Sequence, residues 1–180
     1  VAWLVKHQRA DGDLSVGASQ PMYSHGLATI VLCEAYGLTR DSAIGYAARK
    51  AVRYIEMARC PHTAGWRYRP GDAGDLSVTG WQVMALKSAH MAGLGDESAA
   101  LDATRPFLKS CGKGNYGGLF CYMPQREETV SMTAVGILCM QYLSAYPVLV
   151  ERWIGDARPL ANWTLNGRVP HALLPQRVGA

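Results

Sequence analysis

The sequence predicts an all-α protein built from helical hairpins that repeat about every 54 residues. Three observations support this fold class. Three apolar runs follow polar turns at a regular interval, and their spacing is helical rather than alternating. The segment between the first two runs is apolar on one face only, as in an outer helix. Hairpins of this kind stack into an open solenoid or close into a ring.

The repeat appears when His25, Thr79 and Thr133 are placed at one position, which spaces the units by about 54 residues. The turns before the second and third runs then share an aromatic residue, a tyrosine and a proline. These residues are Trp66, Tyr68 and Pro70 in one turn and Phe120, Tyr122 and Pro124 in the other. The turns are therefore expected to be structural connectors of similar shape.

The apolar runs predict inner helices, because a helix that is apolar on nearly every face is buried. The runs are Leu27–Ala35, Val78–Ala92 and Met132–Leu143. A Gly-Leu pair follows the first two runs, so we expect these helices to end at Gly37 and Gly93 in a left-handed glycine. The third helix is expected to stop before Pro147.

The segments between these runs predict outer helices. Residues 40–59 form an amphipathic helix that Thr39 or Asp41 can cap. The first outer helix is represented by Val1–His7, and a third is expected over residues 96–111, kinked or split by Pro106.

A fourth outer helix is expected near residues 149–164. The sequence thus predicts a partial repeat domain over residues 1–165, about three and a half hairpins, and an irregular tail over 166–180. We find no strand signal, and "GKGNYGG" at Gly112–Gly118 is interpreted as a flexible loop.

Composition narrows the classes of function. The 180 residues are 49% hydrophobic and 18% charged, which is typical of a folded core. The net charge of +4 is scattered, so nucleic acid is not an expected partner. No apolar stretch reaches the roughly 18 residues of a transmembrane segment.

The five cysteines form no CxxC pair, and we expect reduced, buried thiols, which favour a cytoplasmic location. The chain opens within a helical pattern at Val1, so we expect that its natural N-terminus, with any signal peptide, is missing.

Several segments resemble a known superfamily. "WLVKHQRADGDL" resembles the repeat of squalene–hopene cyclases, with Gln8, Asp11 and Gly12 at matching positions and Leu14 where the family prefers tryptophan. "GWRYRPGDAGDLSVTGWQVMALKSA" and "MYSHGLATIVLCEAYG" are similar to bacterial proteins with prenyltransferase and squalene oxidase repeats. The resemblance covers roughly residues 1–146.

This resemblance implies an α/α toroid, in which inner and outer rings of helices surround an apolar, aromatic-lined cavity for an isoprenoid such as squalene. A full ring in the superfamily takes about six hairpins, so the chain would be part of one. The alternative is a non-catalytic helical-repeat module that binds a protein or lipid on its concave face. We also expect self-association through exposed inner helices.

The resemblance also implies chemistry that this chain matches only in part. Cyclases protonate an alkene with the acid of a DxDD motif, which is absent here. Asp13, Asp72 and Asp75 are the nearest candidates for a catalytic acid, and each can instead be a cap or turn residue. His25 matches the histidine that binds zinc in prenyltransferases, but the D-x-C partner is missing, so capping or packing is its alternative.

Aromatic residues in the turns and at inner-helix starts are the candidates for ligand binding, together with His25. They are Trp66, Tyr68, Trp81, Tyr116, Phe120 and Tyr122. Each can equally pack neighbouring hairpins together. We predict no cofactor, and we predict that the isolated chain has no cyclase or transferase activity.

Overall fold

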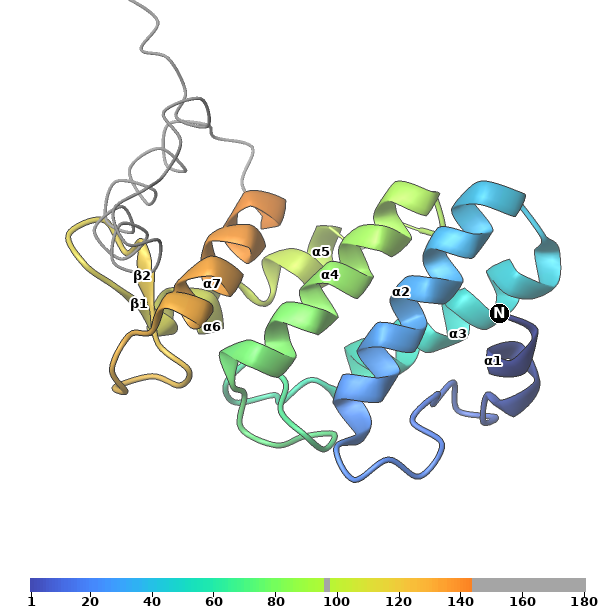
Figure 1. Ribbon diagram of the computed structural model, residues 1–180, viewed down its shortest axis with the longest axis horizontal. Coiled ribbons are helices and arrows are strands. Elements are labelled where there is room, and N and C mark those ends of the chain that lie inside the picture. Colours follow the sequence, from blue (N-terminus) through green and yellow to red (C-terminus); the bar gives the residue numbers. More distant parts are fainter. Residues whose placement is uncertain (96–97, 144–180) are drawn as a thin grey trace, which may run out of the picture.

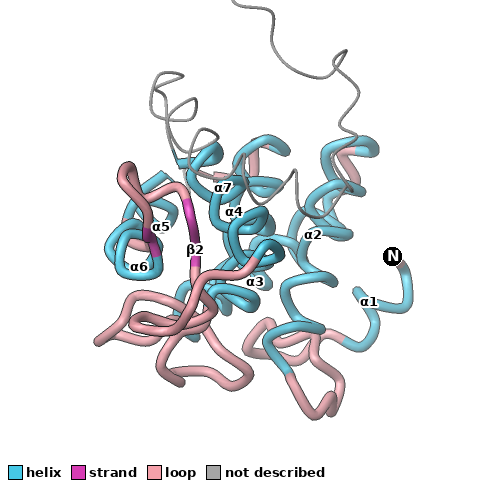
Figure 2. The backbone as a smooth tube through the Cα atoms, turned by 60° about the vertical axis from the view of Figure 1, so that its left-hand side comes forward, coloured by secondary structure: helices cyan, strands magenta, loops and turns pink. Residues whose placement is uncertain are grey.

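The computed structural model describes residues 1–95 and 98–143. This part is mainly helical, with one small antiparallel sheet (Figure 1). Three helices lie side by side in a front layer, with α4 in the middle: α2 (Pro21–Thr39), α4 (Leu76–Ala92) and α7 (Val130–Leu143). The remaining helices are α1 (Ala2–His7), α3 (Ser42–Ala58), α5 (Ser98–Asp102) and α6 (Arg105–Cys111). Of these, α3, α5 and α6 pack behind the front layer, and α1 packs on α3 (Figure 2).

The three front helices run in the same direction, so their N-terminal ends and the turns before them meet at one edge (Figure 1). Backbone hydrogen bonds fix this edge. The N–H of Met22 donates to Tyr68 O over 3.1 Å, and the N–H of Leu76 donates to Tyr122 O over 2.8 Å. Helices α2 and α4 are therefore each tied at the first turn to the loop that precedes the next front helix.

The outer helix α3 has the expected amphipathic pattern. Its buried residues include Ile55 and the alanines Ala47, Ala48, Ala51 and Ala58, while Tyr46 and Met57 are exposed. Asp41 is the cap, since its Oδ1 accepts hydrogen bonds from Ala43 N and Ile44 N over 2.8 and 3.1 Å. Thr39 belongs to α2 instead, where its hydroxyl donates to Ala35 O. Of the two caps that the sequence allowed, the acidic one is used.

One of the two predicted helix ends is confirmed and the other is wrong. Helix α4 ends at Gly93, which is left-handed with φ 70°, and Leu94 N donates back to Ala89 O. Helix α2 continues past Gly37 to Thr39, and Arg40 takes the left-handed conformation with φ 56°. Gly37 lies within the last turn of α2, and a Cβ there would be in ordinary van der Waals contact with Ala92 of α4. The same Gly-Leu signal thus ends one helix and not the other.

The third outer segment is split, as predicted. Helices α5 and α6 are separated by Ala103 and Thr104, and Pro106 lies in the first turn of α6, where a missing N–H costs nothing. The prediction that no strands form was wrong. Strands β1 (Gly112–Lys113) and β2 (Leu119–Phe120) pair antiparallel around the glycine-rich loop. Two-residue strands are too short to show an alternating pattern, which is why the sequence did not reveal them.

The core lies between the two layers. Its largest fully buried side chains include Trp66, Phe107 and Phe120. All five cysteines are also buried as thiols, and burial raises the pKa of Cys111 and of Cys139 to about 12. Among the described residues, no helix has the length and apolar character to cross a membrane. The predictions for Pro147, residues 149–164 and the tail lie outside the described residues.

Candidate functional site

Trp66, a candidate ligand-binding residue, lies in the core. Its indole Nε1 donates to Ile55 O of α3 over 2.7 Å. Its backbone N–H donates to Thr79 Oγ1 over 3.0 Å, and the Thr79 hydroxyl donates back to Trp66 O. One residue therefore joins the turn to an outer and an inner helix. These contacts support the packing alternative for Trp66.

Phe120 is held in the same way in the next turn. Its N–H donates to Thr133 Oγ1 over 3.0 Å, and its ring is buried against Gly136 of α7. A side chain at Gly136 would overlap the ring, so this glycine makes room for the aromatic residue. Phe120 and Tyr116 both border a small pocket of about 240 Å³. Of the two aromatic residues, Tyr116 is the exposed one.

His25 is fully buried, and both ring nitrogens are engaged. Nδ1 accepts a hydrogen bond from Leu14 N over 3.1 Å, and Nε2 donates to Ala51 O of α3 over 3.0 Å. Within the described residues, no group of three His, Cys, Asp or Glu side chains could hold a metal. The geometry supports packing, rather than zinc binding, for His25.

Asp13 and Asp72 close turns. The Asp13 carboxylate accepts hydrogen bonds from Ser15 N and the Ser15 hydroxyl, each over 2.8 Å. The neighbouring His25 ring, followed by these Ser15 bonds, lowers the pKa of Asp13 to about 2 despite its burial. Asp72 is exposed and accepts a hydrogen bond from Arg69 N over 3.2 Å. Both have the turn role that sequence reasoning gave as the alternative to catalysis.

Asp75 is the most connected of the three acidic candidates. It is fully buried at the N-cap of α4, where Oδ1 accepts from Val78 N over 2.9 Å and from Ser77 Oγ over 2.7 Å. Its other oxygen, Oδ2, accepts from Tyr122 OH over 2.9 Å. The capping role is therefore confirmed, and three donors surround the carboxylate.

The Asp75 contacts extend into a chain of hydroxyl groups, which we call the rim network. Tyr68 and Tyr122 share a hydrogen bond of 2.8 Å between their hydroxyls, and Tyr23 OH donates to Ser77 Oγ over 2.6 Å. Arg67 lies alongside, with Nε 3.6 Å from Asp75 Oδ2. The rim network consists of Tyr23, Arg67, Tyr68, Asp75, Ser77 and Tyr122.

The rim network joins two front helices and two turns, and it brings together three of the predicted site residues: Tyr68, Asp75 and Tyr122. Burial, followed by the bonds to Tyr68 and Asp75, raises the pKa of Tyr122. The phenol therefore stays protonated and keeps donating to Asp75 near neutral pH. Chemically, the hydroxyl groups and the Asp75 carboxylate are linked by hydrogen bonds that fix the start of α4, while Arg67 Nε is buried beside them without a hydrogen bond.

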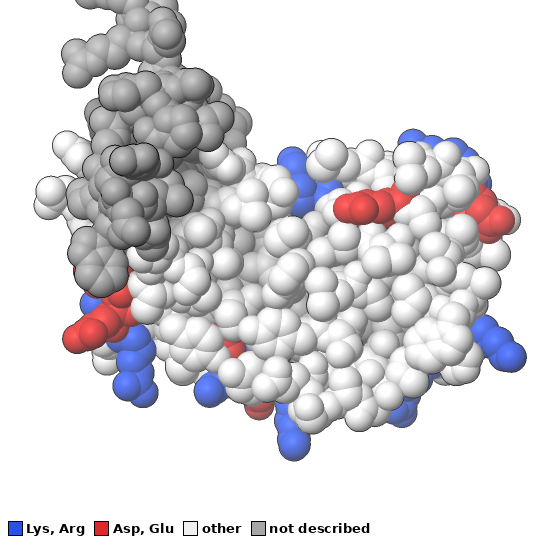
Figure 3. All heavy atoms as spheres, viewed as in Figure 1, with Lys and Arg blue, Asp and Glu red and all other residues white. Residues whose placement is uncertain are grey.

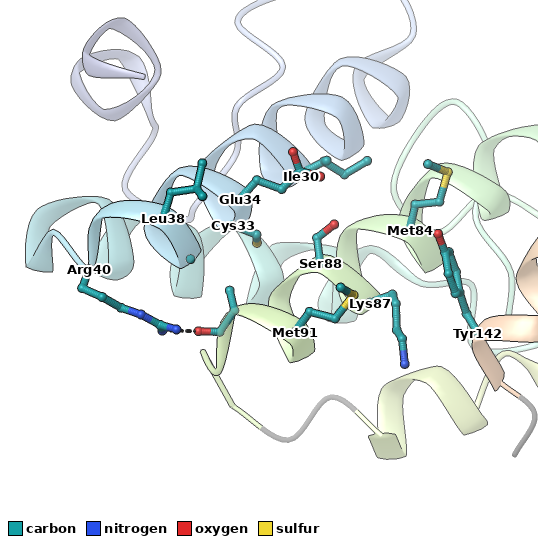
Figure 4. A pocket seen from close by; sticks show the side chains of 12 residues that line it. Ile30, Cys33, Glu34, Leu38, Arg40, Met84, Lys87, Ser88, Met91 and Tyr142 are labelled. Atoms are coloured by element: carbon teal, nitrogen blue, oxygen red, sulfur yellow. Dashed lines mark hydrogen bonds between the residues drawn. The ribbon is translucent and has the colours of Figure 1, made fainter.

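A groove of about 490 Å³ lies elsewhere, along the C-terminal halves of α2 and α4 (Figure 4). Arg40 stands at one end, and Met84 and Tyr142 stand at the other. Its walls are largely apolar, with Glu34 and Lys87 among them. Figure 3 shows that charged residues lie mainly around the margin of this face, while its centre carries other residues.

None of the predicted ligand-binding residues lines this groove, and Trp81 is partly exposed on α4 without bordering it. A sequence signal for the groove does exist. Glu34 and Lys87 interrupt runs that are otherwise apolar, and a charge within an inner helix marks a position open to solvent. Met84, Ser88 and Met91 follow at helical spacing on α4.

A scan of the sequence against protein-family models found no match, and searches of curated proteins and of solved structures found none either.

Proposed function

We propose that the chain is part of an α/α toroid of the squalene–hopene cyclase type, and that its front layer forms a section of the wall of an apolar cavity. The cavity would hold an isoprenoid such as squalene. The observation that carries this proposal is the groove of about 490 Å³ on the front of α2, α4 and α7. A volume of several hundred Å³ is the usual scale of a small-molecule site.

Recurring contacts support the toroid. Met22 bonds to Tyr68 as Leu76 bonds to Tyr122, and each pair lies one repeat of about 54 residues from the other. Trp66 bonds to Thr79 as Phe120 bonds to Thr133, again one repeat apart. Successive hairpins that meet through the same atoms can be extended by further hairpins, which is how helical repeats build arcs and rings.

The exposed side chains of the front layer support an apolar ligand. Leu38 and Met91, at the groove, are 88% and 74% exposed. Covering such side chains stabilises a complex by about 25 cal/mol per Å² of apolar area removed from water. Methionine also adapts to irregular partners, which suits a long flexible hydrocarbon. Among the described residues that line the groove, Tyr142 is the only aromatic one. The groove would therefore hold an apolar ligand mainly by dispersion contacts rather than by the electrostatics of aromatic rings.

Binding can be tested with radiolabelled squalene delivered from cyclodextrin. Ser88→Trp places a large side chain in the groove and should weaken binding about tenfold or more. Met57→Trp is the matched control, because Met57 is 69% exposed on the outer helix α3. Equal binding by both variants, or none by the native chain, would contradict the proposal. Far-UV circular dichroism checks that each variant is folded.

Catalysis is not part of this proposal, because Asp13, Asp72 and Asp75 are engaged with their own turns and caps. Incubation of the chain with squalene, or with farnesyl diphosphate and a cysteine peptide, should leave product at background. Robust turnover in either assay would show that the chain is an enzyme by itself.

A second candidate is a module that binds a protein or a lipid on the same face. The high exposure of Leu38 and Met91 favours it, since side chains exposed to this degree can meet a broad surface as well as a narrow ligand. Phospholipid vesicles in place of squalene distinguish the lipid case. Vesicle binding that Ser88→Trp leaves unchanged would favour the broad surface.

A further inference from the structure

Two of the five cysteines face each other at the end of the small sheet. Cys111 is the last residue of α6 and directly precedes β1, and Cys121 directly follows β2. The antiparallel ladder pairs Gly112 with Phe120, so the two cysteines occupy the next rung. The N–H of Cys121 donates to Cys111 O over 3.0 Å, and the Cys121 thiol donates to the same carbonyl over 3.1 Å.

This rung has the dimensions of a disulfide. Residues that face each other in an antiparallel ladder have Cα atoms about 4.5–5.5 Å apart and side chains on the same face of the sheet. Disulfides join Cα atoms that are about 4.4–6.8 Å apart. The two thiols also influence each other, since burial and then the neighbouring Cys121 raise the pKa of Cys111 to about 12. A sulfur–sulfur bond therefore needs little movement of the backbone.

The other cysteines do not share this arrangement. Cys33 and Cys139 belong to α2 and α7, which lie on opposite sides of α4 (Figure 1). Cys60 follows α3, and despite burial its pKa is lowered by hydrogen bonds with Thr63, with no thiol among the causes. In the part of the chain that the structure describes, the cysteines on facing rungs are therefore Cys111 and Cys121 alone.

We propose that Cys111 and Cys121 are a redox modification site, which a hydroperoxide converts into a disulfide that locks β1 and β2 together. One thiolate attacks a peroxide oxygen and becomes a sulfenic acid, and the other oxygen takes up the thiol proton and leaves as an alcohol or water. The second thiol then attacks the sulfenic sulfur, so that the sulfur–sulfur bond forms and water leaves. The two sulfurs together lose two electrons, which reduce the O–O bond of the peroxide.

The closed hairpin restrains this reaction. Both side chains are fully buried, and the high pKa of Cys111 keeps its thiol protonated near neutral pH, whereas the thiolate is the form that attacks. Each strand has two residues, so opening the hairpin breaks few backbone hydrogen bonds. We therefore expect oxidation to proceed from the opened hairpin, at a rate set by how often the hairpin opens.

The disulfide would act on the segment that holds two front helices. On either side of Cys121, Phe120 packs against Gly136 of α7, and Tyr122 O accepts a backbone N–H at the start of α4. A bond to Cys111 ties this segment to α6 and removes conformational freedom from the unfolded chain. The linked chain should therefore have a melting midpoint about 5–10 °C above that of the reduced chain.

Peptide mapping without reductant tests the site after the folded, reduced chain is treated with hydrogen peroxide. One linked pair of peptides is expected, carrying Cys111 and Cys121. Cys121→Ala should form no linked pair, and its Cys111 should stop at a sulfenic acid that dimedone traps. Cys139→Ala is the matched control, because Cys139 is equally buried, and it should still form the link.

Thermal unfolding of the oxidised chain before and after dithiothreitol measures the lock. Dithiothreitol reduces the disulfide and leaves methionine sulfoxide unchanged, so the difference in midpoint belongs to the sulfur–sulfur bond. An equal midpoint in both forms would contradict the locking role.

The native chain decides the proposal even if a variant fails to fold. Linkage of another pair of cysteines, no linkage, or linkage that appears only once circular dichroism shows unfolding would overturn it. None of these outcomes involves the groove, so the test of squalene binding stands or fails separately.

Discussion

The turns before α2 and α4 are each joined to the helix by one loop residue and one helix residue, and the larger residue of the pair is on the helix in one case and in the loop in the other. In the second turn, the loop contributes the large residue, Trp66, and the helix contributes the small one, Thr79. In the first turn, the loop contributes Leu14 and the helix contributes the larger His25. In both, a side-chain atom of the helix accepts the backbone N–H of the loop residue.

The rings also reach the same outer helix. Trp66 Nε1 donates to Ile55 O, and His25 Nε2 donates to Ala51 O, one turn earlier on α3. One ring comes from a loop and the other from a front helix, yet each carries an N–H to an α3 carbonyl. The comparison teaches that both turns satisfy the same two N–H groups, one of the loop backbone and one of a ring, although different residue types at positions 52 residues apart in the loops do so.

The largest effect is expected from removing the larger ring. Trp66→Ala should lower the free energy of unfolding by about 3–5 kcal/mol, because it leaves a cavity and an unused carbonyl at Ile55. Urea unfolding followed by circular dichroism measures this change. Trp3→Ala is the control, since Trp3 is exposed and should change stability by less than about 0.5 kcal/mol. Similar losses for both variants would contradict the anchoring role of Trp66.

Replacing the pair Leu14 and His25 by the residue types of the second turn, Trp and Thr, tests the comparison directly. Leu14→Trp alone overfills the site and His25→Thr alone leaves it underfilled, so each should cost about 2–3 kcal/mol. The double variant recreates the pair found at Trp66 and Thr79, and it should recover about 1 kcal/mol or more of the summed loss. Purely additive losses in the same urea experiment would show that the two anchors are not equivalent.

The caps of α4 and α3 give a smaller contrast. Asp75→Ala removes a buried cap and leaves Tyr122 OH without its acceptor, so a loss of about 2 kcal/mol is expected. Asp41→Ala removes an exposed cap and should cost about 1 kcal/mol. Thermal unfolding of the two variants compares them. If Asp41→Ala costs more, the rim network contributes nothing beyond capping.

The smallest effect concerns pH and is expected only for the first turn, where Asp13 lies beside His25. The pKa of Asp13 falls from 3.8 to about 2 on folding, so the folded chain holds the ionised form more strongly than the unfolded chain does. This stabilisation is complete above pH 3.8 and is lost as pH falls towards 2. With allowance for solvent screening, it amounts to about 1 kcal/mol. Urea unfolding at several acidic pH values should show this loss in the native chain and not in Asp13→Asn.

Local signals were sufficient to predict much of the fold. The amphipathic pattern of α3 and the caps at Asp41 and Asp75 depend on residues a few positions apart. The same holds for the end of α4 at Gly93, where a Gly-Leu pair closes the last turn. Such features follow from sequence because the interacting atoms belong to one short segment.

What sequence could not supply depends on partners distant along the chain. Gly37 has the same local signal as Gly93, but α2 continues to Thr39, and Arg40 at its end donates a hydrogen bond to Ala92 O of α4. His25 matched a zinc ligand by position, whereas its neighbours prove to be Leu14 N and Ala51 O. The rim network and the groove each form between helices and turns that are distant along the chain, so no single segment predicts them.

The common direction of the front helices has an electrostatic consequence. Parallel helices add their dipoles, so the layer has a positive pole at the edge of the turns and a negative pole at the opposite edge. Asp75 places a carboxylate at the positive pole, and Arg40 donates to Ala92 O, over 2.5 Å, at the negative one. These two charges offset the repulsion of like poles held side by side. The groove lies near the negative pole, where the field favours cationic character in a bound molecule over anionic character.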